Sequence, residues 1–328
     1  MNRRDSVLAL VALGALPLVA PFDAVAQSEK RLRRVGMLYG SSREGVASEM
    51  ETFVSRLREL GYVPGKNVEI IARFAEGVPS RLPVLARDLL EEKVEVVFVP
   101  NTQGALALQQ QSDRVAIIFV AGDPVDAGLI SSLARPGRNA TGFTLGAATI
   151  AAKRVELLKD AFPSIRKLGV LFDPKFPVQK EIVLVTDASR KLGIDVVLAE
   201  ASSREQYFEE IARLRSAGVD AYDVVYTGSS FAMRREIAAA IRATRRPAIY
   251  GVGRFADDGG LMAYSWQTLK VSVLAAEYAD RILRGAKPAD LPVQEPTIIE
   301  LVVNLATARE QGITLRQSVL IRADRVIE

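Results

Sequence analysis

Short hydrophobic runs rich in β-branched residues alternate with amphipathic segments along most of the chain. In the segments, apolar residues recur at helical spacing, as at Phe53, Leu57 and Leu60, and Gly61 is placed to end that helix. Runs that are apolar throughout are typical of parallel strands covered on both faces, so the alternation predicts an α/β fold. We predict strands at 34–38, 67–73, 94–99, 116–120, 167–172, 195–199, 221–226, 248–250, 261–264 and 298–303.

Two lobes, each with its own parallel sheet, fit this pattern better than one sheet, because so many strands in a single open sheet are unusual and 328 residues exceed the usual size of one core. The polar stretch 139–152 interrupts the pattern and predicts a first crossover between lobes. A second crossover is predicted after Trp266, and a third at 291–297, where two prolines favour a stiff, extended hinge. The predicted lobes are 33–146 plus 266–293, and 147–265 plus 294–328.

The amino-acid composition limits the kinds of catalytic and metal chemistry that the protein can perform. The chain is 49% hydrophobic and 25% charged, as in globular proteins, but it has no Cys and no His. These absences exclude disulfides, thiolate nucleophiles, Ser-His-Asp triads and the usual zinc ligand sets. A net charge of +4 that is spread along the chain is not the clustered positive charge that nucleic-acid-binding proteins carry. We therefore expect no cofactor, no metal and no nucleic-acid partner.

The first residues have the pattern of an export signal. Arg3 and Arg4 precede an apolar run at 7–19, and Ala24 and Ala26 are the small residues that a signal peptidase requires. Because of the arginine pair, the twin-arginine export pathway is an alternative to the Sec pathway. No other stretch reaches the ~18 apolar residues that span a bilayer. We predict that cleavage near Ala26 leaves a monomer in the periplasm, not inserted in the membrane.

The residues that follow the predicted strands carry hydroxyl, amide and aromatic groups in both halves. In open parallel sheets, ligands bind beyond the carboxyl ends of the strands. This composition predicts a pocket for a small, partly apolar ligand with an oxyanion. The candidate ligand-binding residues are Tyr39, Ser41, Asn101, Thr102, Asp123, Phe172, Asp173, Thr227, Ser229, Tyr250 and Tyr264.

Each candidate also has a structural interpretation. Asp123 and Asp173 precede prolines, where Asp commonly caps a helix. Ser41, Thr102 and Ser229 are possible helix caps, and the tyrosines could be core rings with one polar edge. The sole tryptophan could pack in the core or stack on a ligand.

Signals for covalent chemistry are weak. Gly251-x-Gly253-x-x-Ala256 superficially matches a dinucleotide fingerprint, but the sequence DDGG follows where a helix should open. No paired carboxylates stand together at strand ends, which argues against an enzyme. A hydrolase or isomerase that uses Asp or Glu as acid and base is the alternative of a different class.

Several segments of the chain resemble segments that occur in the same order in a known protein family. They are RVGMLYG, GDPVDAGLISSLARPGRNATG, RPAIYGVGRFADDGGLMAYS, LPVQEPTIIELVVNLATAREQGI and LIRADRVIE. The chain from about Arg33 to Glu328 resembles ABC-transporter substrate-binding proteins of the tryptophan-binding type. The resemblance implies the type I periplasmic-binding-protein fold, with two Rossmann-like lobes joined by a three-segment hinge and closing on a ligand. It also implies delivery of that ligand, without chemistry, to an ABC permease in the inner membrane.

The resemblance implies aromatic carboxylates or aromatic and apolar amino acids as ligands. Relatives commonly carry Gly-Asp-Pro after the strand that ends at Tyr226, whereas this chain has TGSS. The missing Asp favours a ligand without an ammonium group, but Asp173 could supply a carboxylate, so both ligand classes stay open. We expect docking on Ser41 and Thr102, followed by lobe closure. A periplasmic sensing subunit of a membrane receptor is the alternative within binding proteins.

Overall fold

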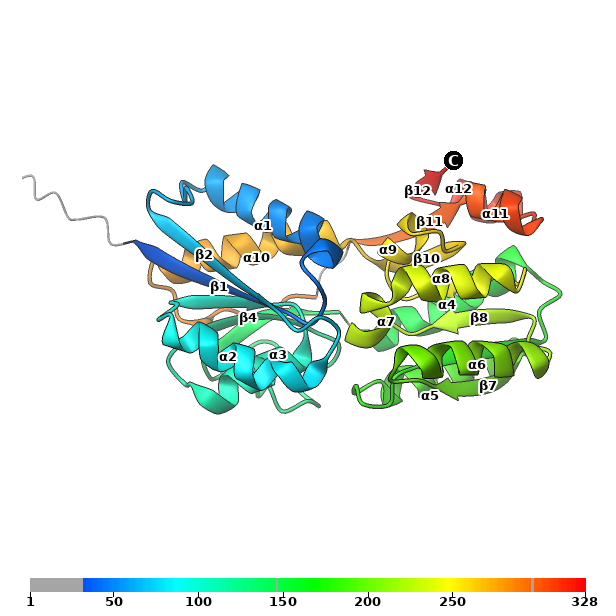
Figure 1. The fold of residues 1–328 in the computed structure, drawn as a ribbon, viewed down its shortest axis with the longest axis horizontal. Helices are drawn as coiled ribbons and strands as arrows, with labels where there is room; N and C mark the ends of the chain where they lie inside the picture. Colours follow the sequence, from blue (N-terminus) through cyan, green and yellow to red (C-terminus); the bar gives the residue numbers. More distant parts are fainter. Residues whose placement is uncertain (1–31, 146, 296–297) are drawn as a thin grey trace, which may run out of the picture. The chain divides into compact units, whose positions relative to one another are not determined.

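The computed structural model describes residues 32–145, 147–295 and 298–328, and of residues 147–149 it describes only the backbone. The export signal predicted at 1–26 lies outside the described residues. Strands and helices alternate along the described chain, and the strands form two sheets (Figure 1). This confirms the predicted α/β fold.

The first sheet is parallel throughout and has the strand order β2-β1-β3-β4-β5. From β1 the chain goes to one side to form β2 and then to the other side to form β3. The carboxyl ends of β1 and β3 therefore flank a topological switch point, where open α/β sheets bind ligands. The strands are β1 (Arg33–Tyr39), β2 (Val68–Phe74), β3 (Val96–Val99), β4 (Ala116–Ala121) and β5 (Ala140–Thr144).

The second sheet has the order β12-β11-β10-β9-β8-β6-β7, with its switch point between β6 and β8. Its pairs are parallel except β10 with β11. These two strands are antiparallel because the chain leaves the sheet after β10 and returns at the same end to begin β11. The strands are β6 (Lys167–Phe172), β7 (Asp195–Glu200), β8 (Ala221–Val224), β9 (Ala248–Tyr250), β10 (Met262–Trp266), β11 (Ile299–Asn304) and β12 (Arg325–Ile327).

The helices follow the predicted spacing. In α1, Phe53 and Leu57 are fully buried, and the helix ends where Gly61 adopts a left-handed φ of 94°. The longer helices are α1 (Ala47–Glu59), α2 (Leu82–Glu91), α3 (Thr102–Gln111), α4 (Ala147–Ala161), α5 (Gln179–Lys191), α6 (Arg204–Ser216), α8 (Arg234–Ala243) and α10 (Thr268–Leu283). The shorter ones are α7 (Gly228–Ala232), α9 (Arg254–Asp257), α11 (Leu305–Gln311), α12 (Gln317–Ile321) and the 3-10 turns η1 (Glu44–Val46), η2 (Pro79–Arg81) and η3 (Pro288–Asp290).

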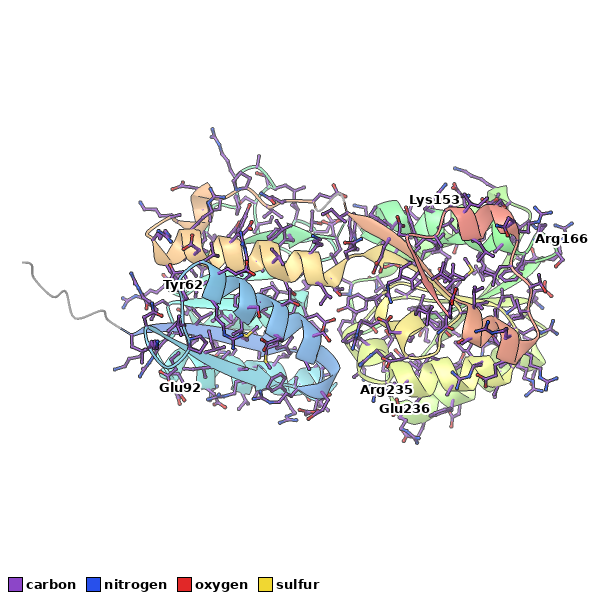
Figure 2. The ribbon with its side chains drawn as sticks, turned by 90° about the horizontal axis from the view of Figure 1, so that it is seen from above. Tyr62, Glu92, Lys153, Arg166, Arg235 and Glu236 are labelled. Atoms are coloured by element: carbon purple, nitrogen blue, oxygen red, sulfur yellow. The ribbon has the colours of Figure 1, made fainter. Side chains whose placement is uncertain are left out.

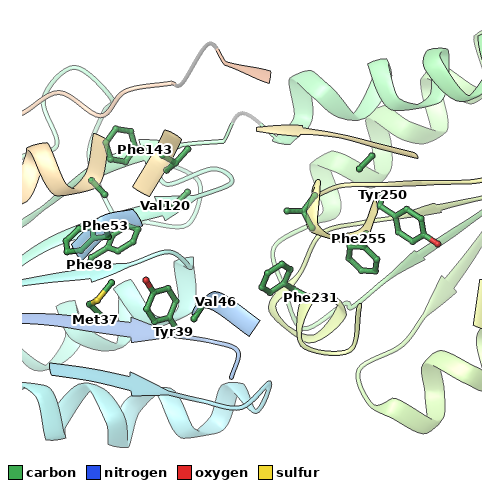
Figure 3. Close-up of a cluster of buried hydrophobic side chains, with 14 of the residues drawn as sticks. Met37, Tyr39, Val46, Phe53, Phe98, Val120, Phe143, Phe231, Tyr250 and Phe255 are labelled. Carbon is green, nitrogen blue, oxygen red and sulfur yellow. The ribbon is translucent and has the colours of Figure 1, made fainter. Parts of the chain in front are cut away.

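Hydrophobic cores fill the faces of both sheets. In the first sheet, Phe53 of α1 stacks on Phe98 of β3 with ring centroids 5.0 Å apart, and α10 packs against both elements (Figure 3). In the second sheet, Tyr250 of β9 stacks on Phe255 of α9 at 4.6 Å. Charged side chains such as Arg235 and Glu236 of α8 remain exposed (Figure 2). Each sheet thus has the apolar cover that parallel strands need.

The sequence pattern predicted the stretch 139–152 as a crossover between lobes. The structure shows that this stretch also contains β5 and the start of α4. The strand is fully buried despite its polar sequence. Thr141 satisfies its hydroxyl by donating to the Leu291 carbonyl at 2.6 Å. Gly142 has a φ of 145°, and a Cβ there would lie 2.1 Å from the Phe119 carbonyl oxygen. Only glycine lets β5 approach β4 this closely.

The chain passes between the two sheets three times. It leaves the first sheet after β5, returns from β10 to α10, and leaves again before β11. In the last passage, the Gln294 N–H donates to the Gly142 carbonyl, and the Thr144 N–H donates to the Gln294 carbonyl, both at 2.9 Å. Pro296, predicted as part of a hinge, lies outside the described residues. That these passages act as a hinge, and the exact lobe boundaries, stay predictions.

Among the described residues, no helix has the length and apolarity that crossing a membrane requires.

Candidate ligand-binding site

A cavity of about 190 Å³ opens at the switch points of both sheets. From the first sheet, its lining includes Tyr39 at the end of β1, and Asn101 and Thr102 after β3. From the second sheet it includes Tyr226 and Thr227, which follow β8. The site therefore lies where the strand order of each sheet reverses, as the general rule for open α/β sheets requires.

Aromatic side chains make up much of the wall. Tyr39 and Val46 on one side and Phe231 on the other line the cavity and belong to the cluster in Figure 3. The other aromatic lining residues are Phe98, Phe176, Tyr226 and Trp266, and Trp266 is the only tryptophan of the chain. An apolar wall with few polar groups is typical of a pocket for a small organic molecule.

Five of the predicted ligand-binding residues line the cavity: Tyr39, Ser41, Asn101, Thr102 and Thr227. Asn101 is also the N-cap of α3, where its side-chain oxygen accepts from the Gly104 N–H at 2.6 Å. Thr227 is the N-cap of α7 and forms a reciprocal capping box with Ser230. The caps of α3 and α7 are therefore these two residues and not Thr102 and Ser229, which the sequence offered as possible caps and which lie inside the helices. The contact of the five lining residues with a ligand stays a prediction.

The other six predicted residues do not line the cavity. Asp173 and Ser229 hydrogen-bond to each other at 2.6 Å, and Asp173 also accepts from the Ser202 hydroxyl. Phe172 and Tyr250 are buried in the core, and Tyr264 is a half-buried residue of β10. Asp173 is thus occupied by the protein's own hydroxyl groups.

Asp123 lies in a turn and pairs with Lys180 of α5 at 2.8 Å. Neither Asp123 nor Asp173 caps a helix, because a turn follows each of them. Asp123 accepts from the Asp126 N–H at 3.2 Å, and Asp173 accepts from the Lys175 N–H at 3.0 Å. The carboxylates stabilise Asp-Pro turns.

A buried charge cluster that the sequence analysis missed borders the cavity. Arg154 of α4 is 1% exposed, and its guanidinium donates to Asp223 at 3.0 Å and to Glu181 at 2.6 Å. Burial raises the pKa of both carboxyls and outweighs the attraction of Arg154. Burial disfavours the charged form of Arg154. The attraction of the two carboxylates outweighs burial and raises the pKa of Arg154, so the guanidinium stays charged. The cluster leaves no positive charge free for a ligand.

A second missed group is Glu49, in the first turn of α1. It lines the cavity, is 8% exposed, and has one oxygen, Oε2, that is buried without a hydrogen-bond partner. Two donors in the wall, the Tyr39 hydroxyl and Trp266 Nε1, are buried and unpartnered as well. Burial, reinforced by the Glu49 charge, raises the pKa of Tyr39, and the same two causes raise the pKa of Tyr226 to about 12. Both hydroxyls therefore remain protonated near neutral pH.

Helical spacing is the signal that could have found these charges. Glu49 precedes the buried Phe53 by four residues, so it falls on the apolar stripe of α1. Arg154 likewise lies four residues after the buried Ile150. A charged residue on an apolar stripe is buried, and buried charges need partners.

The described residues contain no group of three or more Asp, Glu, His or Cys placed to hold a metal ion. What the cavity offers is an aromatic enclosure with a few directed polar groups. This arrangement can bind and release a solute.

The fold and this site define the class of proteins that bind a small solute between two α/β units. Residues 41–327 match the model of a family described as ABC transporter substrate binding protein. The chain belongs to this family. It is therefore the solute-binding component of an ABC transporter and not an enzyme, as the resemblance implied.

The chain is also similar to individual proteins and solved structures. A tyrosine-binding protein of Clostridioides difficile (strain R20291) is 25% identical over 285 residues, which are 85% of this chain and 81% of that protein. A Streptococcus pneumoniae ABC domain solved in complex with L-Trp has a TM-score of 0.82 at 24% identity, over 90% of this chain and 100% of that chain. A conserved domain protein of Vibrio cholerae gives the same TM-score, identity and coverage. These structures share the two-sheet fold, which confirms the predicted architecture.

Proposed function

We propose that the chain is a periplasmic receptor whose cavity captures a small organic solute with an aromatic or apolar body. The solute is an aromatic carboxylate or an aromatic or apolar amino acid, and the loaded protein delivers it to an ABC permease in the inner membrane. The export signal predicted at 1–26 supports the location. The relatives named for tyrosine and solved with L-Trp support the ligand class.

The observation that carries the proposal is the wall of the cavity. Rings from both sheets surround a small volume, and Phe98, Tyr226 and Trp266 are among the lining residues against which an aromatic ligand can pack. Ser41 and Thr102, which follow β1 and β3, are hydroxyl-bearing residues of the lining. The first N–H groups of α3 have no acceptor within the helix and can bind a carboxylate. One end of the cavity thus suits an oxyanion and the rest suits a ring or an aliphatic group.

Lobe closure would complete the site. A ligand that touches both walls stabilises the arrangement in which both are present, and this biases the equilibrium toward the closed form. Thr227 and Phe231 of the second half would then cover a solute docked on Thr102. Release to the permease requires only that the equilibrium be reversed.

A thermal-shift screen of the purified chain tests the proposal. The panel contains aromatic carboxylates, aromatic and branched amino acids, and sulfonates. A true ligand at a hundredfold excess over its Kd adds about 2.7 kcal/mol to the stability of the folded protein. Failure of every aromatic and branched compound, with stabilisation by a polar solute such as a sugar, would contradict the proposed ligand class.

A further inference from the structure

The charges that line the cavity do not balance. Glu49 and Glu181 are acidic lining residues, and Arg154 is the basic one. Arg154 already binds Glu181 at 2.6 Å and Asp223 at 3.0 Å, so its positive charge is neutralised inside the wall. Within the described lining, the charge of Glu49 is left over, which disfavours a ligand that carries only a negative charge.

The carboxylate of Glu49 is held by the protein on one side only. Its Oε1 lies 3.5 Å from the Thr268 hydroxyl, which is a long hydrogen bond. Its Oε2 is buried and accepts no hydrogen bond. A buried carboxylate oxygen without a donor is costly, so this position favours a bound group that donates or carries positive charge.

Arg254 of α9 does not fill this role. Its Nε lies 4.0 Å from Glu49 Oε1, beyond hydrogen-bond distance, and has no partner of its own. The Arg254 guanidinium also lies 3.7 Å from Asp257. Arg254 is thus shared between two carboxylates and leaves Oε2 of Glu49 open.

We propose that Glu49 binds the ammonium group of an amino acid whose side chain is aromatic or apolar. This inference rests on the proposed function and narrows it, because it selects the amino acid over the plain aromatic carboxylate. An ammonium group brings three donors and one positive charge to the vacant acceptor. The ligand's own carboxylate has donors in the Tyr39 and Thr102 hydroxyls. A ligand without the ammonium group would leave Oε2 of Glu49 without a donor, beside a second negative charge.

Matched ligand pairs test this role by calorimetric titration. Phenylalanine is compared with hydrocinnamate, tryptophan with indolepropionate, and leucine with isocaproate, since each pair differs only in the ammonium group. We expect the preferred amino acid to bind at least about 30-fold more tightly than its deaminated analogue, as for one buried charge pair. Glu49→Gln, which keeps the shape and removes the charge, is expected to abolish this preference without weakening the binding of the analogue.

Glu51→Gln is the matched control, because it removes the same charge from an exposed position on the same helix. It is expected to keep the wild-type preference. If Glu49→Gln fails to fold, Glu49→Asp retains the charge on a shorter side chain and should lower the preference without abolishing it. A preference that Glu49→Asp leaves at the wild-type level would overturn the assignment.

The outcomes separate this inference from the proposed function. Deaminated analogues that bind as tightly as the amino acids overturn the role of Glu49 and leave the proposed function standing. If no compound with a carboxylate binds, phenethylamine and tryptamine are tested. Amine binding that Glu49→Gln abolishes would support Glu49 and contradict the proposed ligand class, and absence of amine binding would refute both.

Discussion

At the scale of single residues, helical spacing places three charges of this chain against the cavity. Glu49, Arg154 and Glu181 each lie on the apolar stripe of their helix, for example Glu181 with the buried Val185 and Ala188. The stripe itself is visible in the sequence, and so is the charge within it. Which partner each charge meets is not visible, because Arg154 contacts Asp223, which is 69 residues away along the chain.

Thr102 is the residue whose predicted role is most directly testable. It lines the cavity at the first position of α3. Thr102→Ala should weaken binding of the true ligand by about 1–3 kcal/mol, because a buried polar group of the ligand loses its partner. Titration followed by the fluorescence of Trp266, the only tryptophan and a lining residue, measures the change for any ligand that is not itself fluorescent.

Thr52→Ala is the control for that measurement, since Thr52 lies on α1 outside the cavity and its hydroxyl donates to the Ser48 carbonyl. It should leave the affinity unchanged. Equal affinities of wild type and Thr102→Ala would remove Thr102 from the ligand-binding residues.

At the scale of helices and strands, the buried cluster of Arg154, Glu181 and Asp223 joins α4 and α5 to β8. Two carboxylates share one guanidinium in a fully buried position, and burial raises the pKa of both. A carboxyl whose pKa is higher in the folded state than in the unfolded state stabilises the protein at low pH, and this contribution is lost as the pH rises through the folded-state pKa.

Glu181→Gln should reveal this pH dependence. The stability of the wild type relative to Glu181→Gln is expected to be highest below the ordinary Glu pKa of 4.5 and to fall as the pH rises above it and through the raised folded-state pKa. Urea unfolding at several pH values without ligand measures the difference. A difference that rises with pH would mean that the attraction of the guanidinium outweighs burial and lowers the pKa of Glu181.

Strands were predicted well where they are apolar and poorly where they are polar. The runs at β3 and β4 stand out because they are apolar throughout and rich in the β-branched residues Val and Ile, which favour strands. β5 was missed because ATGFT looks like a loop, and only the contacts of Thr141 with Leu291 and of Gly142 with β4 explain its burial. β12 is a three-residue edge strand, too short for its periodicity to be recognised.

At the scale of the whole molecule, contacts link residues on both sides of the cavity. Lys180 of α5 pairs with Asp123 at 2.8 Å, and Gln103 of α3 donates to the Lys175 carbonyl at 3.1 Å. Lys180 is 61% exposed, so water screens its ion pair. We therefore expect the energy of ligand capture to come from the buried wall and not from this rim.

Lys180→Ala tests whether the binding energy comes from the buried wall and not from the exposed rim. It should change the affinity for the true ligand by less than about threefold at physiological salt, as is usual for exposed ion pairs. Titration at low and high ionic strength measures the effect. A loss as large as that expected for Glu49→Gln would show that the rim, and not the wall, controls closure.

The sequence by itself determined the α/β class, two units, the order of most strands and helices, and the family. These follow from local periodicity and from ordered segments, which need no knowledge of distant contacts. Five of the predicted residues reached the cavity because strand ends at a switch point converge by topology alone.

Only the tertiary structure decided which polar groups the protein uses for itself and which it leaves open. Asp173 had the right place in the sequence to meet an ammonium group, but Ser202 and Ser229 occupy its oxygens. Glu49 does not directly follow a strand, yet one of its oxygens is buried in the cavity wall without a partner. Hydrogen-bond satisfaction depends on residues far apart in the chain, and it is complete only when the fold has brought them together.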